Sequence, residues 1–86
     1  MADKETEIFT IEKNKWTKIS CRVCVLNGNV FIDFREMYQP RGENDFKPSK
    51  KGFTLKSAES VKELGNAIVN NIDKIQKSFD QYSGEN

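Results

Sequence analysis

The chain has 86 residues, of which 36% are hydrophobic and 31% are charged, and its formal net charge is +1. This length allows one domain with a small core, so a homodimer that shares core surface is a reasonable expectation. No apolar run is long enough for a transmembrane helix, and the acidic N-terminus lacks the apolar segment of a secretory signal. These features predict an intracellular protein that does not contact a membrane.

The small net charge conceals an uneven distribution of charged residues. Residues 1–12 hold one basic and four acidic side chains (−3), residues 13–52 hold nine and four (+5), and residues 53–86 hold four and five (−1). The positive charge falls on the segment predicted to be a sheet. Such asymmetry is typical of a surface that faces a polyanion, although an ordinary solvated sheet surface accounts for it equally well.

The first half of the chain is predicted to be a leader and three strands. Residues 1–7 are expected to be a disordered leader, and residues 8–11 a short first strand. Apolar and polar side chains alternate over residues 15–26, which predicts a second strand with one apolar and one cationic face. Asn27-Gly28 favours a type I′ turn, so a third strand over residues 29–37 should complete a tight antiparallel hairpin.

The second half is predicted to be a fourth strand over residues 51–55 and a helix capped by Ser57. Six apolar residues at steps of three or four form one helical face: Val61, Leu64, Ile68, Ile72, Ile75 and Phe79. The helix should fade into a tail over residues 81–86. The expected fold class is α+β, with a four-stranded antiparallel sheet followed by one C-terminal helix in a homodimer. One helix can cover only one face of that sheet.

The sequence offers little support for catalysis or metal binding. Cys21 and Cys24 match C-x-x-C, but there is no histidine or second cysteine pair to complete a zinc site. Residues three apart in a strand point to opposite faces, so we expect no disulfide, with Cys21 in the core and Cys24 on the surface. Without a general base, a carboxylate pair or a phosphate loop, we expect no enzyme, no cofactor and no metal.

Nucleic-acid binding is better supported by the pattern of residues. Lysines cluster at residues 13–18 and 47–51, and aromatic Trp16 and Tyr38 lie among the basic residues. Cations beside a stacking surface suit a single nucleic-acid strand. In the alternative interpretation, the two aromatic residues belong to a dimer core and the lysines only increase solubility.

Three segments carry a resemblance to a known family. Residues 30–38, VFIDFREMY, are similar to the strand VLIDIREYW of the transcriptional coactivators called positive cofactor four. Residues 46–55, FKPSKKGFTL, resemble that family's MKPGRKGISL, and residues 9–16, FTIEKNKW, resemble its FQIGKMRY. The chain is identified as a member over residues 8–80. The resemblance implies four strands and a helix in a homodimer that binds single-stranded or unwound DNA.

By this resemblance, eight residues are expected to contact nucleic acid: Lys13, Lys15, Trp16, Arg35, Tyr38, Lys47, Lys50 and Lys51. Tyr38 takes the place of a stacking tryptophan. The family's hairpin also carries an aromatic residue and lysines, which are absent from residues 26–29 here. Lys18 or Arg22 is the candidate to compensate for them.

The expected function is DNA binding with little sequence preference, in support of transcription or of DNA replication and recombination. The family's serine- and lysine-rich regulatory arm has no counterpart in these residues, so coactivation and a replication role stay equally open. The alternative is a protein-interaction scaffold of the transcription or replication machinery, with weak nucleic-acid affinity. Expected partners are single-stranded DNA, a second copy of the chain, and proteins of that machinery. The expected location is the nucleus in a eukaryote, or the cytoplasm for a bacterial or phage protein.

Overall fold

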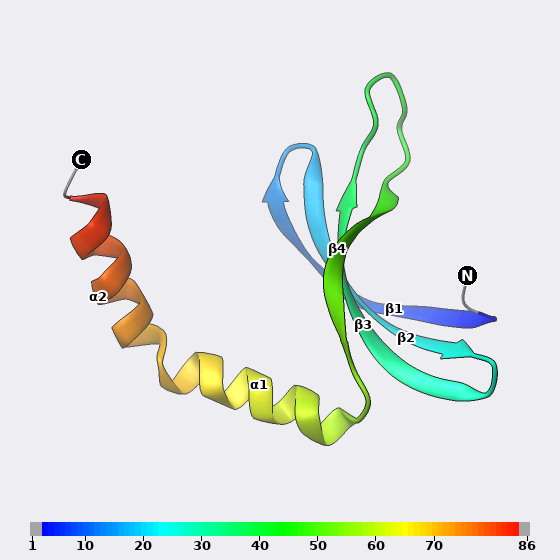
Figure 1. The fold of residues 1–86 in the computed structure, drawn as a ribbon. Coiled ribbons are helices and arrows are strands. Elements are labelled where there is room, and N and C mark those ends of the chain that lie inside the picture. The colour runs from blue at the N-terminus through cyan, green and yellow to red at the C-terminus, as the bar shows by residue number, and fades with distance from the viewer. Residues whose placement is uncertain (1–2, 85–86) are drawn as a thin grey trace.

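The computed structural model describes residues 3–84 as a curved antiparallel sheet with a helical arm (Figure 1). The sheet has the order β1-β2-β3-β4. Its strands are β1 (Lys4–Asn14), β2 (Thr17–Leu26), β3 (Asn29–Tyr38) and β4 (Lys47–Leu55). The arm consists of α1 (Ala58–Asn70) and α2 (Ile72–Ser83). No helix among residues 3–84 is long and apolar enough to cross a membrane.

Strand β1 is longer than the sequence pattern predicts. It starts at Lys4 and pairs with β2 along its length, with bulges at Ile8 and Lys13. The backbone amide of Asp3 donates to the carbonyl of Val25 at 2.7 Å. Much of the expected leader is therefore part of the sheet, because the long strand β2 provides a partner for it; residues 1–2 lie outside the described range.

Strands β2 and β3 form the hairpin predicted at Asn27-Gly28. Both residues have positive φ, at 52° and 79°, as a type I′ turn requires. The two strands then pair without a bulge from Leu26↔Asn29 to Thr17↔Tyr38. This continuous register fixes which side chains share a face of the sheet.

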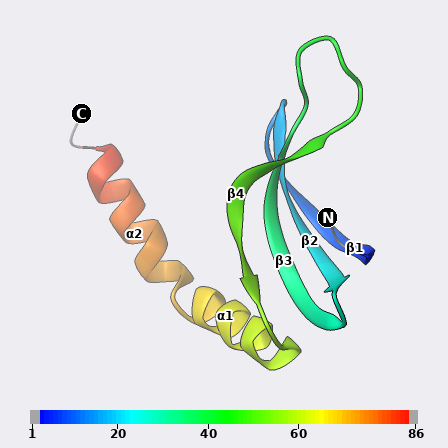
Figure 2. The ribbon, with the colours of Figure 1, turned by 45° about the vertical axis from the view of Figure 1, so that its right-hand side comes forward.

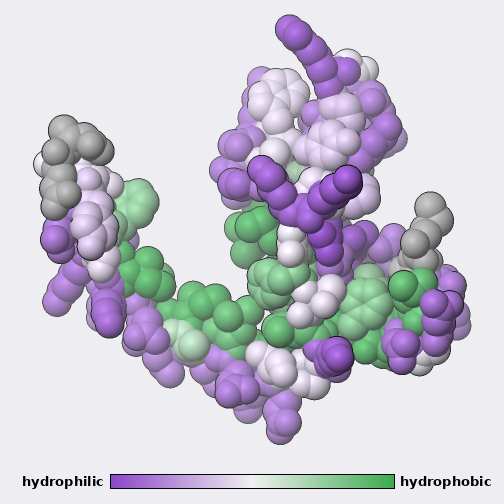
Figure 3. Space-filling model, in the orientation of Figure 1, coloured by the Kyte–Doolittle hydropathy of each residue, from purple (hydrophilic) through white to green (hydrophobic). Residues whose placement is uncertain are grey.

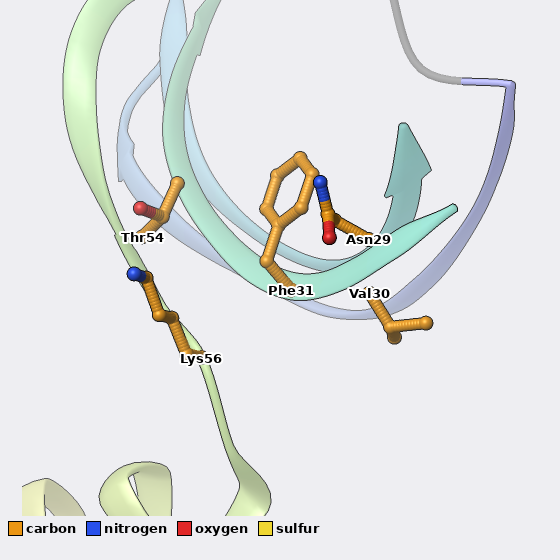
Figure 4. Close-up of a pocket in the computed structure, with 5 residues that line it drawn as sticks. All are labelled: Asn29, Val30, Phe31, Thr54 and Lys56. Carbon is orange, nitrogen blue, oxygen red and sulfur yellow. The ribbon is translucent and has the colours of Figure 1, made fainter. Parts of the chain in front are cut away.

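The curved sheet has an apolar convex face and a mixed concave face. In Figure 4, Phe31 points into the curl of the sheet and Val30 points to the other side. By strand alternation, the convex face carries Phe9, Ile11, Ile19, Cys21, Val23, Val25, Val30, Ile32, Phe34, Phe53 and Leu55. Cys21 and Cys24 lie on opposite faces, yet both are buried, so the expectation that Cys24 is a surface residue is wrong.

The chain buries few side chains by itself. The buried hydrophobic residues among those described are Cys21, Cys24 and Met37, and neither helix contains a buried residue. The radius of gyration is 15.8 Å, whereas a compact domain of this length would have about 12 Å. In Figure 3, hydrophobic residues lie along the side of the helical arm that faces the sheet and on the neighbouring part of the sheet.

The expectation of one C-terminal helix is wrong, because the structure has two. Asn71 leaves the helical conformation, with φ −114° and ψ 12°. Its side-chain amide donates to the carbonyl of Ala67 at 2.7 Å, and its own carbonyl accepts from the amide of Ile75 at 2.9 Å. Asparagine competes in this way with regular helical hydrogen bonds, and two adjacent asparagines interrupt the helix here.

The helical arm also leaves the faces of the sheet uncovered. Helix α1 contacts the sheet next to β4, and the arm then runs away from the sheet (Figure 1). After a turn of 45° the arm still stands clear of the strands (Figure 2). The chain thus presents an apolar convex face and an amphipathic arm, neither of which it covers itself.

Candidate nucleic-acid interface

The β1–β2 turn and the β3–β4 loop lie at the same end of the sheet, which we call the loop end (Figures 1 and 2). The side chain of Asn14 shapes the turn, accepting from the amides of Trp16 and Thr17 at 2.9 and 3.0 Å. The carbonyl of Trp16 accepts from the amide of Gln39 at 2.9 Å. This bond ties the turn to the loop, so residues far apart in the sequence meet at one rim.

The two aromatic residues predicted to stack on bases lie at the loop end and are solvent-accessible. Trp16 is 54% exposed and Tyr38 is 40% exposed. Tyr38 is paired across the sheet with Thr17 and Lys47. The Nζ atom of Lys15 lies 5.1 Å from the centroid of the Trp16 ring. Each ring therefore has a cationic neighbour, as a surface for a single strand requires.

Glu36 forms ion pairs with two of the lysines predicted to contact nucleic acid. Its Oε1 accepts from Lys13 Nζ at 2.6 Å, and its Oε2 lies 3.9 Å from Lys51 Nζ. The hydrogen bond from Lys13 holds the pKa of Glu36 below its usual value. Glu36 was not among the predicted site residues, because the contact depends on strand register and a bulge rather than on nearness in the sequence.

Lys47, the first residue of β4, forms an ion pair with a residue of the β3–β4 loop. Its Nζ lies 3.0 Å from a carboxylate oxygen of Glu43, and this hydrogen bond raises the pKa of Lys47. Lys50 is exposed and makes no ion pair among residues 3–84. The loop end thus combines paired lysines with unpaired ones.

Arg35 belongs to a separate group on the concave face. It donates to Asp33 through Nη2 at 2.7 Å and through Nε at 3.3 Å. Arg22 of β2 also donates to Asp33, through Nη2 at 2.8 Å, and it donates to Glu5 of β1 through Nη1 at 2.7 Å. Strand alternation points Arg35 and Glu36 to opposite faces, so the structure does not bring Arg35 into the cluster of Lys13 and Lys51.

Asp33 is the buried centre of this concave group, only 4% exposed. Burial raises the pKa of a carboxyl, but the hydrogen bonds from Arg35 and Arg22 outweigh that effect, and the pKa of Asp33 is lowered. The same contact raises the pKa of Arg35. The register of β2 and β3 places Arg22 opposite Asp33, and Arg35 follows two residues later on the same strand and the same face.

A groove of about 640 Å³ follows the concave face above this charged group. Its lining runs from Phe46 and Pro48 at the loop end to Leu26 and Phe31 near the hairpin. A smaller hollow of about 440 Å³ continues it between Phe31, Thr54 and Lys56 (Figure 4). No local sequence pattern predicts this groove, because it arises from the curvature of the sheet.

Exposed aromatic rings among lysines, on the rim of an antiparallel sheet, are typical of a nucleic-acid-binding module. A protein-family model agrees with this class. The family described as Transcriptional Coactivator p15 (PC4) matches residues 13–66, more than half of the chain. The chain belongs to this family, which confirms the resemblance drawn from its sequence. Family membership supports a DNA-binding role.

A solved structure has a similar fold. It is described as the bacteriophage T5 homolog of the eukaryotic transcription coactivator PC4, implicated in recombination-dependent DNA replication. The match has a TM-score of 0.57 and covers 93% of this chain and 97% of the phage chain, at 15% sequence identity. At this identity the likeness concerns the fold. The search of curated proteins gave no match.

Proposed function

We propose that the chain binds single-stranded or unwound DNA as a homodimer, with little sequence preference, in support of transcription or of DNA replication and recombination. The observation that carries this proposal is the loop end, where exposed Trp16 and Tyr38 lie among lysines from β1, from β4 and from the β1–β2 turn. Stacking and charge recognise the backbone and the flat face of any base, so sequence preference is weak.

In this proposal the phosphates meet the cations of the predicted site: Lys13, Lys15, Arg35, Lys47, Lys50 and Lys51. The ion pairs to Glu36 and Glu43 do not prevent this, because exposed pairs contribute little to stability and exchange readily. Arg35 contributes from the concave face, where Asp33 holds its guanidinium in place. The role is binding, and we expect no catalytic activity.

The surface area of the chain supports the homodimer. The chain exposes 7203 Å². A compact monomer of 9.9 kDa would expose about 5200 Å², so roughly 2000 Å² per chain is in excess. An excess of this size matches the area that permanent dimers bury. The apolar convex face and the apolar side of the helical arm are the surfaces that a second copy would cover.

The test is a titration of a fluorescently labelled thymidine oligonucleotide, followed by anisotropy at low salt. We expect saturable binding, weaker binding to a duplex of the same length, and similar affinities for single strands of different sequence. Binding that depends on one particular sequence, or that prefers the duplex, would contradict the proposal. The proposal assigns the protein to the compartment that holds DNA, which is the nucleus in a eukaryote and the cytoplasm in a bacterium.

The second candidate function is a protein-interaction scaffold of the transcription or replication machinery. Two observations favour it. Lys13 and Lys47 are already paired with carboxylates, and the turn over residues 26–29 carries no cation. If the folded protein shows no oligonucleotide binding at low salt, the scaffold becomes the better explanation.

A further inference from the structure

Phe46 and Lys18 form a cation–π pair at the loop end of the concave groove. Lys18 Nζ lies 4.6 Å from the centroid of the Phe46 ring. Lys18 is held beside Met37 by the pairing of β2 and β3, and Met37 is paired with Pro48 of β4. Phe46, Met37 and Pro48 all line the groove. The pair therefore sits at a fixed place on the sheet although the two residues are far apart in the sequence.

Lys18 does not form an ion pair with a carboxylate among the described residues. Both arginines of the concave face are held by Asp33, and Arg22 is also held by Glu5. A lysine over a ring is held only weakly at an accessible site, so Lys18 can turn toward a stronger anionic partner.

The pair of Phe46 and Lys18 has the chemistry of a site for one unpaired base. A base offers a flat apolar face to an aromatic ring and a phosphate to a nearby cation. Phe46 provides the ring, and Lys18 provides the cation. The site lies on the concave face, whereas strand alternation points Tyr38 to the convex side, so one ring cannot substitute for the other.

We propose that Phe46 and Lys18 form a further stacking site for single-stranded DNA at the mouth of the concave groove. Phe46 stacks on a base, and Lys18 contacts a phosphate next to that base. This inference rests on the proposed function, since it extends the same DNA path to a second face of the sheet.

The first experiment compares Phe46→Leu with Phe31→Leu in the full chain. Leucine keeps an apolar side chain and removes the ring. We expect Phe46→Leu to weaken thymidine-oligonucleotide binding roughly 5- to 150-fold, the range for one lost stacking contact. Phe31 lies on the same face at the far end of the groove and has no cation over its ring, so Phe31→Leu should bind like the wild type. Equal losses in both variants would overturn the assignment.

A second experiment detects the contact directly and does not depend on affinity. In a Trp16→Phe background, Phe46→Trp places the protein's sole tryptophan in the groove. Stacking on a base should quench its fluorescence when the oligonucleotide binds. Unchanged emission while anisotropy reports saturated binding would overturn the inference.

The role of Lys18 is tested by the salt dependence of binding. Lys18→Gln should lower the slope of log affinity against log salt by about 0.7, the value for one phosphate contact in a single strand. Lys74→Gln removes the same charge from the helical arm and should leave the slope unchanged. Equal slopes in the two variants would reject the phosphate contact.

These outcomes separate the inference from the function on which it rests. If the wild type does not bind single-stranded DNA at low salt, both fail. If the wild type binds and Tyr38→Ala weakens binding while Phe46→Leu does not, only the stacking site at Phe46 fails.

Discussion

Asp33 is the residue on which the concave face depends. It is buried and accepts hydrogen bonds from two arginines on two strands. Removing the charge of such a residue leaves both guanidinium groups without their common partner. Breaking a buried ion pair from one side typically costs about 3–5 kcal/mol.

Asp33→Asn should therefore destabilise the protein at neutral pH and change how its stability depends on pH. Because the pKa of Asp33 is lowered in the folded state, its ionised form adds stability above the pKa of the unfolded chain, about 3.9. That contribution is lost as pH falls through the lower folded pKa. Urea unfolding at pH 7 and pH 3, at constant protein concentration, measures this.

The matched control is Asp73→Asn on α2. Its free energy of unfolding should fall between pH 7 and pH 3 by as much as that of the wild type. If Asp33→Asn loses as much stability as the wild type between pH 7 and pH 3, then Asp33 is not the group responsible.

Substitutions of Tyr38 show whether its ring contacts DNA or belongs to the core or an interface. If it stacks on a base, Tyr38→Ala should cost roughly 1–3 kcal/mol in oligonucleotide affinity, and Tyr38→Phe much less, because the ring remains. The melting temperature should change little in either variant, since the residue is exposed. A large fall in melting temperature with unchanged affinity of the folded fraction would identify Tyr38 as a core or interface residue instead.

The sequence predicts candidate residues for contact with nucleic acid, but not which side chains surround each of them. The eight predicted residues stay a prediction, and the structure divides them between two faces. Glu36 and Phe46 were not foreseen as neighbours of lysines. The contacts of Glu36 and Phe46 depend on how the strands pair, and bulges shift the pairing of β1 with β2 and of β3 with β4. The amino-acid composition and the spacing of residues do not reveal where these bulges lie.

Among the structural elements, strand β4 depends on one glycine. A Cβ atom at Gly52 would lie 2.2 Å from the carbonyl oxygen of Phe34 and 3.0 Å from Cζ of Arg35. Gly52→Ala should therefore push β4 away from β3 and destabilise the protein by about 1–3 kcal/mol. The melting temperature and urea midpoint report this change.

Gly65 on α1 is the comparison for Gly52. A Cβ atom there meets nothing within 4 Å, and alanine is favoured over glycine in a helix by about 1 kcal/mol. Gly65→Ala should stabilise the protein. If both substitutions have the same effect on the melting temperature, the close approach at Gly52 does not matter for stability.

Local signals predicted most of the elements. The hairpin at Asn27-Gly28 and the cap at Ser57 depend on a few neighbouring residues and are present in the structure. The break at Asn71 was missed because the apolar spacing continues across it from Ile68 to Ile72. The early start of β1 was missed because its first residues are polar and owe their conformation to the partner strand.

For the whole molecule, assembly is the first quantity to measure. We expect light scattering at micromolar concentration to give the mass of two chains, because one chain leaves its convex face and helical arm uncovered. A mass of one chain across that concentration range would refute the proposed homodimer.

The second quantity is the response of DNA binding to salt. Each phosphate neutralised on a single strand contributes a slope of about −0.7, so six cations in one protomer should give a slope near −4. Titrations at several salt concentrations measure it. A flat response would show that the six cations do not contact phosphates.

The near absence of a core within one chain has a genetic consequence. In the proposed homodimer, one interior is built from two copies of the same face, so a single codon change alters that interior in two places. Phe34→Ala would remove its ring from each of two stacked pairs with Phe53. Unfolding would also be coupled to dissociation, so dilution would lower the melting temperature. Substitutions on the convex face should therefore be tolerated less well than equally sized ones in a monomer of this length.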